Sequence, residues 1–497
     1  VTYIDNIKYK TINEPDAKQV SGLPQNPRLS NFSWSPDEAK VAFTNTTAKG
    51  VELWVFDFTS GAARKLTNDN LNANLGMPFT WYRSSDALLA LVLPKDKPAL
   101  ISSAEVIPEG PTVSVSEKGA KAQNRTYQDL LQNATDEANF ETLVTSELYK
   151  VDLNGSASLW KGKDIYSGFS FSPDGKYLMV ITMHRPYSYI VPLYRFPTTT
   201  NIYDINGKLI SNFHEKPLIE IMPKGFMATT TGKRGISWRA DKPATLHWVE
   251  ALDNGDPEVK VDYRDEVFEL DAPFNGTPKS LVKTINRYGG LTWGNDNIAI
   301  VRDNWYNTRN TKTYLFNPSN AQQKPVILFD RSTEDRYGDP GWFHTVKNQY
   351  GRYILNIEGD NTYLIGSGFT EKGQFPFVDR YNLKTKKTKR VFQSNYTDKK
   401  LDIIDIINAK RGEFLVMIQS QTEYPNYYIY NTMKRIAPMP ITRFENPFKA
   451  IAGVHKEVIK YKRADGVELS GTLYLPIGYD MQKKEKLPMV MWEYPIE

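Results

Sequence analysis

One pattern recurs along this chain: an aromatic residue, a short polar turn, an apolar strand, and then further strands joined by turns. It is clearest at residues 32–37 (FSWSPD) and 169–175 (FSFSPDG). The Ser-Pro-Asp-Gly run suits a tight turn, because Pro presets φ, Asp hydrogen-bonds the backbone and Gly accepts a positive φ. Seven such units are expected, over residues 30–67, 77–160, 167–213, 234–284, 288–329, 340–393 and 402–444.

Consecutive units of this length, each with about four strands, predict a mainly β chain folded as a seven-bladed β-propeller over residues 30–450. A single four-stranded sheet cannot bury both of its faces, so neighbouring sheets must supply the missing core. The composition agrees, since 12% of the residues are aromatic and the chain has 31 Gly and 30 Pro. Such a composition favours strands and turns over helices.

The segment after the repeats has a different character. Residues 455–480 give two strand-like runs around the turn at 464–466, and Leu487–Trp492 is a short apolar run of the kind that becomes a buried central strand. Residues 451–497 therefore read as the first strands of a truncated α/β-hydrolase domain. The nucleophile of such a domain sits in a G-x-S-x-G elbow, and these 497 residues contain no such motif. Residues 1–29 are expected to form an N-terminal segment that packs on this domain.

An insertion at 94–145 separates two strands of the second unit. Its first half is rich in Pro, Gly, Ser and Lys and predicts an extended loop. Its second half predicts one or two short helices, with Thr126 as N-cap and Asp129 in the first turn. The insertion is either a lid or docking arm against the second domain, or a mobile surface segment.

Several stretches resemble the prolyl oligopeptidase family of serine peptidases, and specifically its glutamyl endopeptidase branch. The most specific is GISWRADKPATLHWVEALDNGDP at 235–257, and others are ELWVFDFTSGAARKLT, NRTYQDLLQNATDEANFE and GVELSGTLYLPIGYD. The resemblance covers residues 30–497. It implies an endopeptidase with a Ser-Asp-His triad that cuts after Glu, with the triad beyond Glu497 and the propeller controlling substrate access. The chain alone is then expected to be inactive.

The resemblance also implies one catalytic residue within the chain. A strand that leads into the oxyanion loop of this family often ends in a Tyr whose hydroxyl binds the tetrahedral intermediate. Tyr494, in MWEYPIE, occupies the matching place.

Two pairs of arginines are candidates for holding the carboxylate of a substrate. Arg185 and Arg195 lie in a loop rich in Pro and aromatic residues, and Arg302 and Arg309 lie in VRDNWYNTRN. Arginine can bind a carboxylate through two parallel hydrogen bonds. The alternative is that these residues pair with local acids or stack on Tyr.

Other classes of site are not indicated. The five histidines, His184, His214, His247, His344 and His455, have no metal-site spacing, and the acidic run at 253–258 lacks the pattern of a calcium loop. No metal or cofactor is expected. The basic run at 384–390 is interpreted as a solvated hairpin turn and not as a nucleic-acid patch, since the chain's net charge is only +5.

Compartment and partners are less constrained. The chain has no Cys and no apolar stretch long enough to span a membrane. It begins at Val1, for which a cleaved secretory signal is one explanation, so a periplasmic or secreted protein is expected, with the cytoplasm as the alternative. The expected partners are peptide substrates and the remainder of the catalytic domain, which another chain could supply. The competing function is a non-catalytic propeller that binds peptides or a protein.

Overall fold

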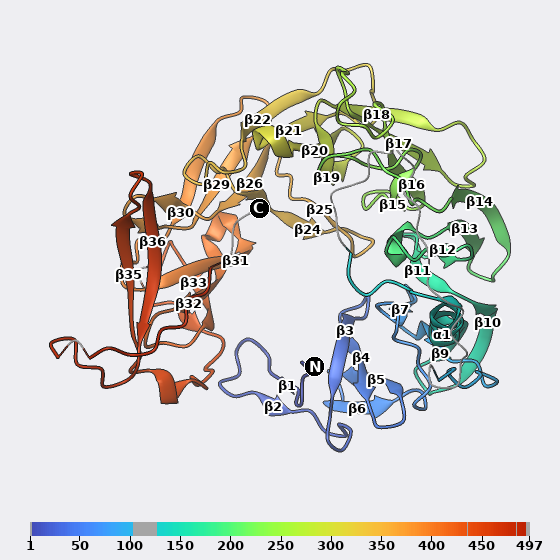
Figure 1. Ribbon diagram of the computed structural model, residues 1–497, viewed down its shortest axis with the longest axis horizontal. Helices are drawn as coiled ribbons and strands as arrows, with labels where there is room; N and C mark the ends of the chain where they lie inside the picture. Colours follow the sequence, from blue (N-terminus) through green and yellow to red (C-terminus); the bar gives the residue numbers. More distant parts are fainter. Residues whose placement is uncertain (1, 103–126, 435, 484, 494–497) are drawn as a thin grey trace. The chain divides into compact units, whose positions relative to one another are not determined.

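The computed structural model describes residues 2–102, 127–434, 436–483 and 485–493. Within these residues, seven four-stranded sheets follow one another in chain order (Figure 1). The fold is a seven-bladed β-propeller, which confirms the fold class expected from the repeats.

The first three sheets follow the chain in order, although the insertion at 94–145 separates two strands of the second. Their strands are β3 (Leu29–Trp34), β4 (Lys40–Thr46), β5 (Val51–Asp57) and β6 (Ala62–Lys65), then β7 (Phe79–Trp81), β8 (Ala87–Val92), β9 (Ser146–Asp152) and β10 (Ala157–Asp164), then β11 (Tyr166–Phe171), β12 (Tyr177–Met183), β13 (Thr198–Asp204) and β14 (Leu209–Lys216).

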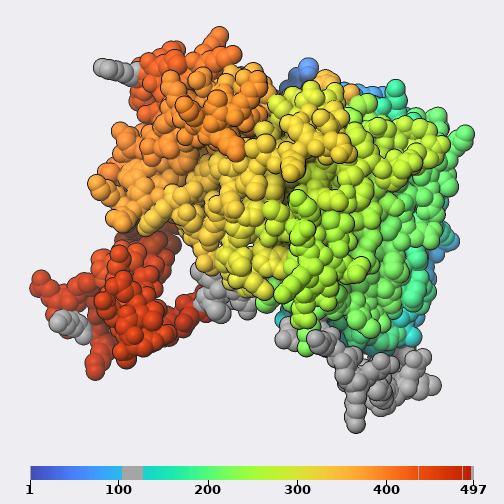
Figure 2. All heavy atoms as spheres, turned by 90° about the horizontal axis from the view of Figure 1, so that it is seen from above, coloured from blue at the N-terminus to red at the C-terminus, as the bar shows by residue number. Residues whose placement is uncertain are grey.

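The other four sheets continue the series. Their strands are β15 (Arg234–Trp238), β16 (Thr245–Ala251), β17 (Asp265–Asp271) and β18 (Lys279–Thr284), then β19 (Arg287–Asn295), β20 (Ile298–Trp305), β21 (Asn310–Phe316) and β22 (Val326–Ser332), then β23 (Trp342–Phe343), β26 (Asn361–Gly366), β29 (Phe377–Asn382) and β30 (Thr388–Gln393), then β31 (Lys400–Asn408), β32 (Glu413–Gln419), β33 (Asn426–Asn431) and β34 (Met439–Pro440). In the space-filling view, the part of the chain that contains β15 to β22, in green to yellow, forms one continuous surface (Figure 2).

Shorter elements connect or extend the sheets. They are the two-stranded pairs β1 (Lys8–Tyr9) with β2 (Lys18–Gln19), β24 (Thr345–Lys347) with β25 (Tyr353–Leu355), β27 (Phe369–Thr370) with β28 (Gly373–Gln374) and β35 (His455–Lys462) with β36 (Glu468–Leu475), the helix α1 (Ala134–Val144), and the 3₁₀ turns η2 (Leu193–Arg195), η3 (Tyr306–Thr308), η4 (Ala409–Arg411) and η5 (Lys449–Ile451). The basic run at 384–390 lies at the turn between β29 and β30, as interpreted from the sequence.

The core lies between neighbouring sheets. Strand β8 is buried along its whole length, because sheets cover both of its faces. Leu89 and Leu91 of β8 belong to one buried cluster with Leu178 and Val180 of β12. Similar clusters join the third sheet to the fourth and the fourth to the fifth. The apolar residues of each repeat therefore fill the wedge between two sheets, as the repeat pattern requires.

In the first three sheets, the polar turn after the first strand keeps its geometry even where its sequence changes. In the third sheet, Ser172 Oγ donates to Asp174 Oδ1 at 2.6 Å, and Gly175 has a φ of 75°. The corresponding positions in the first and second sheets are Glu38, with a φ of 58°, and Ser85, with a φ of 60°. The turn is thus left-handed at its fourth residue with or without Gly.

The helix of the insertion begins later than expected. Asn133 is its N-cap, and the Asp136 N–H donates to Asn133 Oδ1 at 2.9 Å. Asp129 has a φ of 55° and lies before the helix. Thr126, the predicted N-cap, lies outside the described residues. The helix begins after Asn133 and not earlier, because the Asn133 side chain caps it and Asp129 adopts a left-handed conformation.

By internal contacts the chain divides into two units, one of residues 1–364 and 380–389, the other of residues 365–379 and 390–497. In the second unit, β35 and β36 form a hairpin whose turn has Gly466 at a φ of 88°. Leu487–Trp492 forms no strand, and Val490 and Trp492 are 97% and 88% exposed. The expected buried strand is therefore not formed, because a central strand needs neighbours on both edges and the described residues of this unit supply none there.

Candidate functional site: arginines and cavities

Arg185 forms ion pairs with two carboxylates of this chain. Its Nε lies 2.8 Å from Glu141 Oε1, and its Nη1 pairs with Glu137 of α1. The Tyr187 hydroxyl donates to the same Glu141 Oε1 at 2.9 Å. The hydrogen bond with Glu141 is the main reason why the pKa of Arg185 is raised. Arg185 therefore fastens α1 to the loop after β12, which is the alternative that the sequence left open.

Arg195, the other member of this pair, has a different environment. It is only 4% exposed and lies in η2, with its guanidinium 5.3 Å from the centre of the Tyr127 ring. Its backbone carbonyl accepts from the Ile219 N–H at 3.1 Å. Of the two arginines, only Arg185 is exposed. A shared role of the pair in binding substrate stays a prediction.

Arg302 lines a cavity of about 270 Å³ at the fifth sheet. The guanidinium makes no hydrogen bond or ion pair with any residue that the structure describes. The aromatic residues Phe329, Trp342 and Phe343 line the same space. Polar residues, among them three threonines, complete the lining, so the cavity combines aromatic surface with several polar groups.

Arg309 does not accompany Arg302 in this cavity. Its Nε lies 3.3 Å from Glu334 Oε1, and its guanidinium stacks 3.8 Å from the centre of the Tyr306 ring. The second guanidinium in the cavity belongs to Arg331, which pairs with Asp339 at 2.9 Å. The sequence pattern missed Arg331 because it lies on β22, the strand beyond β21 from Arg302 in this sheet.

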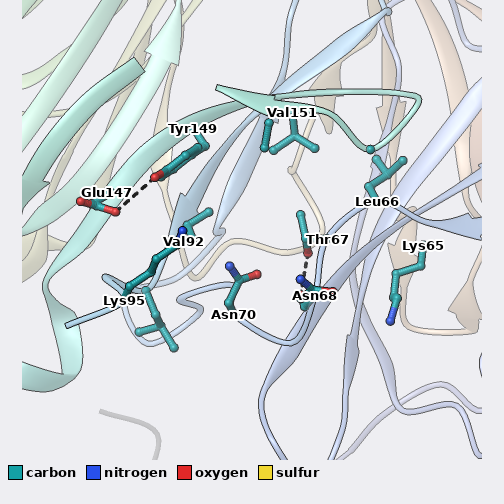
Figure 3. Close-up of a pocket in the computed structure, with 13 residues that line it drawn as sticks. Lys65, Leu66, Thr67, Asn68, Asn70, Val92, Lys95, Glu147, Tyr149 and Val151 are labelled. Atoms are coloured by element: carbon teal, nitrogen blue, oxygen red, sulfur yellow. Dashed lines mark hydrogen bonds between the residues drawn. The ribbon is translucent and has the colours of Figure 1, made fainter. Parts of the chain in front are cut away.

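A cavity of about 400 Å³ opens beside the first two sheets (Figure 3). Tyr149 and Glu147 face it from β9, with the Tyr149 hydroxyl 3.5 Å from Glu147 Oε2. Asn70 Oδ1 is buried there without a hydrogen-bond partner. The cavity contains none of the arginines predicted from the sequence.

The acidic run at 253–258 lies in turns, and its first residue has a further role. Asp253 is fully buried and accepts from Arg264 and Arg287, with Nη–Oδ2 distances of 2.8 Å to each. Burial alone raises the pKa of a carboxyl, yet these two arginines lower the pKa of Asp253 on balance. Asp253 is therefore the centre of a buried ion network.

The described residues contain no group of three or more His, Cys, Asp or Glu side chains placed to hold a metal ion. Nor does that part of the chain include a helix both long and apolar enough to cross a membrane. Tyr494 lies outside the described residues, and its role as an oxyanion donor stays a prediction.

Comparison with known proteins gives two sequence relatives. The chain is 36% identical over 512 aligned positions to a protein of Oryza sativa subsp. japonica named "Probable glutamyl endopeptidase, chloroplastic". It is 34% identical to the Arabidopsis thaliana protein of the same name. These alignments cover 97% of this chain and 53% and 52% of the relatives. The chain therefore spans about half the length of the curated relatives that it matches.

Other comparisons add less. No family model matches the chain. Among solved structures, acylaminoacyl peptidase from Pyrococcus horikoshii aligns with 90% of this chain and 57% of its own, at 11% identity and a TM-score of 0.42. A likeness of this degree adds nothing to the assignment, which depends on the sequence relatives. On their similarity along nearly its whole length, the chain belongs to the prolyl oligopeptidase family, in the branch of the glutamyl endopeptidases.

Proposed function

We propose that this chain is the propeller part of a serine endopeptidase that cleaves peptides after Glu. The observation that carries the proposal is the 36% identity, over 97% of the chain, to a protein named as a glutamyl endopeptidase. The seven sheets supply a scaffold of the kind on which loops and cavities can select a substrate. In this proposal the propeller restricts access to the catalytic domain, so that short or unfolded peptides are preferred.

The reactive groups of the proposed enzyme come from sequence that follows residue 497. The 497 residues contain no G-x-S-x-G elbow, so we expect this chain alone not to hydrolyse peptides. The direct test is labelling with a fluorophosphonate, which reacts with activated serines. A protein that continues past residue 497 is expected to be labelled, and residues 1–497 alone are not. If the continuation has no elbow serine, or a replaced one, the peptidase proposal is wrong.

We propose Tyr494 as an oxyanion donor of this enzyme. A phenol directed at the developing negative charge in a dry site lowers the barrier by about 3 kcal/mol. Tyr494→Phe in the longer protein is therefore expected to lower kcat about a hundredfold with little change in KM, because the bond tightens only in the transition state. Equal kcat values for the variant and the unaltered protein remove Tyr494 from the mechanism.

Export to the periplasm or the medium also stays a prediction. The two relatives carry "chloroplastic" in their names, which describes those plant proteins. Fractionation of the source cells with a marker for each compartment tests it. Recovery of the protein with the cytoplasmic marker would contradict export.

A further inference from the structure

A single hairpin, β24–β25, reaches the polar turns of four different sheets. Asn348 Nδ2 donates to the Ala240 carbonyl of the fourth sheet at 2.8 Å, and Arg352 Nη2 donates to the Phe171 carbonyl of the third at 2.9 Å. Lys347 pairs with Glu38 of the first sheet. Figure 1 shows the hairpin extending inward from the strands that flank it. Its tip is therefore held in a fixed place among the turns.

The second sheet reaches the hairpin through Arg83. Arg83 Nη2 donates to the Gln349 carbonyl at 2.6 Å, and Arg83 Nη1 donates to the carbonyls of Tyr350 at 3.0 Å and Pro173 at 2.9 Å. The Arg83 guanidinium also lies 5.4 Å from the centre of the Tyr350 ring. Arg83 thus joins the hairpin tip to the third sheet.

A cavity of about 230 Å³ lies between this tip and the turns of the first three sheets. Its lining includes three cations, Arg83, Lys347 and Arg352, and no acidic residue. Trp34 and Tyr350 contribute aromatic surface to it. Lys347 is neutralised by Glu38, so the positive charge that remains in the cavity is that of the two arginines.

The two arginines are close together and have no counter-ion in the part of the chain that the structure describes. Both guanidinium groups donate to carbonyls of the same stretch, Phe171 to Pro173. Among the described residues, the partners of the two side chains are neutral carbonyls and an aromatic ring. Partial desolvation of the guanidinium by the surrounding protein, with the like charge of Arg83 as the second cause, lowers the pKa of Arg352. Two cations held side by side without an anion repel each other, and an anion between them removes that repulsion.

Arg352 retains the donors that an anion needs. A guanidinium has five N–H donors, and Arg352 uses one of them, on the Phe171 carbonyl. Its side chain is exposed to the cavity. Arg83 donates to three carbonyls, so its main role is to position the hairpin. Its charge adds to the positive potential of the cavity.

We propose that the cavity bounded by Arg83 and Arg352 is an oxyanion-binding site, which takes a carboxylate or phosphate group between the two guanidinium groups. Paired guanidinium groups recognise such groups through charge-assisted hydrogen bonds. The site lies among the turns of the first three sheets and is independent of the proposed peptidase activity. Its ligand is either a free inorganic anion or the carboxylate of an acidic peptide, both of which present the same chemistry.

Calorimetric titration of the full 497-residue chain tests the proposal with two probes. One is inorganic phosphate, and the other is a short Glu-containing peptide with blocked ends, compared with the same peptide in which Gln replaces Glu. The site binds phosphate, the Glu peptide or both, with an affinity that falls as salt is added. Binding of the Glu peptide and not of its Gln counterpart identifies a peptide carboxylate as the source, whereas binding of phosphate alone identifies an inorganic anion. If neither probe binds, the proposal is wrong.

Variants locate the site. Arg352→Met is expected to raise the Kd at least about tenfold, and Arg352→Lys, which keeps the charge, less than that. Arg64→Met is the matched control, since Arg64 is an exposed arginine on β6 outside this cavity, and its Kd is expected to equal that of the unaltered chain. Unchanged affinity in Arg352→Met contradicts the proposal.

Thermal unfolding separates lost binding from lost folding. Without added anion, Arg352→Met is expected to unfold close to the unaltered chain, because relief of the like-charge repulsion offsets loss of the hydrogen bond to the Phe171 carbonyl. Phosphate or the Glu peptide, whichever binds, is expected to raise the Tm of the unaltered chain and not that of Arg352→Met. Equal stabilisation of both proteins would show that the anion binds elsewhere.

Discussion

His247 is a buried histidine that the fold keeps neutral. It lies on β16, is 8% exposed, and packs its ring 5.3 Å from that of Trp293. Burial, with the charge of Arg239 second, lowers the pKa of His247 from 6.5 to about 4.

This pKa makes stability depend on pH. The unfolded chain takes up a proton near pH 6.5 and the folded chain only near pH 4, so the folded state loses stability as pH falls through this window. The loss from His247 alone is about 3 kcal/mol. In urea unfolding between pH 7 and pH 4, His247→Gln is expected to show a correspondingly smaller loss than the unaltered chain. The same pH dependence in both proteins would show that His247 is not neutral in the folded state.

Arg239 is a buried cation whose removal is expected to destabilise the folded chain. It is fully buried, pairs with Glu269 and Asp241, and lies 3.9 Å from the centre of the Trp293 ring. Arg239→Met leaves the buried carboxylate of Asp241 without its cation, while Glu269 keeps only Lys279, and is expected to lower the free energy of unfolding by about 3–5 kcal/mol.

The control for Arg239 is a double variant. Arg239→Met combined with Asp241→Asn is expected to recover part of the loss, because the uncompensated charge is then removed. A double variant less stable than Arg239→Met alone would contradict this assignment. The measurement is urea unfolding of each variant at pH 7.

Among the elements, α1 is held by both charge and apolar contacts. Glu137 and Glu141 pair with Arg185, while Val144 and Phe140 pack in a cluster with Phe196. Arg185→Ala is expected to increase amide hydrogen exchange over residues 134–144 several-fold and to leave the sheets unchanged, because exposed ion pairs contribute about 0–1 kcal/mol. Arg185→Lys is expected to restore part of the protection.

The outcome also decides between two roles for Arg185. Arg185→Ala can leave exchange in α1 unchanged and yet abolish the preference of a longer, active protein for Glu over Gln. That result would show that Arg185 binds the substrate and does not fasten the helix. Hydrogen exchange monitored by mass spectrometry supplies the first readout, and peptide hydrolysis supplies the second.

The repeat elements were predictable because each has a local cause. Ser172, Asp174 and Gly175 form a turn from their own chemistry, and the aromatic and aliphatic residues beside them fill a wedge whatever the neighbouring sheet is. The hairpin β24–β25 was not predictable, since its contacts lie with four distant turns. One signal was available: Arg83 occupies, in YRSS, the place that Pro36 and Pro173 occupy in the other turns. An arginine where the turn favours Pro indicates a role outside the turn.

The candidate site was less predictable than the fold, because its contacts join residues that are distant in sequence. Arg302 and Arg309 are close in sequence, yet Arg309 pairs with Glu334 and Arg302 shares its cavity with Arg331. Likewise the exposed run Leu487–Trp492 has the composition of a central strand, but a strand of that kind depends on partners that local composition does not supply. Neighbours that are distant in sequence decide both cases.

At the scale of the whole molecule, we propose that the propeller belongs to a Glu-specific peptidase. The repeats predict the fold, the sequence relatives show the family, and those relatives extend well beyond the half that this chain matches. Two peptides that differ only in Glu or Gln before the cleaved bond test the specificity, because they share size and shape and differ in charge.

The most direct measurement is therefore kcat/KM for this peptide pair, with a protein that contains residues 1–497 and the sequence that follows, and with residues 1–497 alone as the control. The account predicts cleavage of the Glu peptide at least about a hundredfold faster than the Gln peptide, as expected when a buried cation is left unpaired by Gln, and no cleavage by the control. Equal rates for the two peptides, or cleavage by residues 1–497 alone, would contradict it.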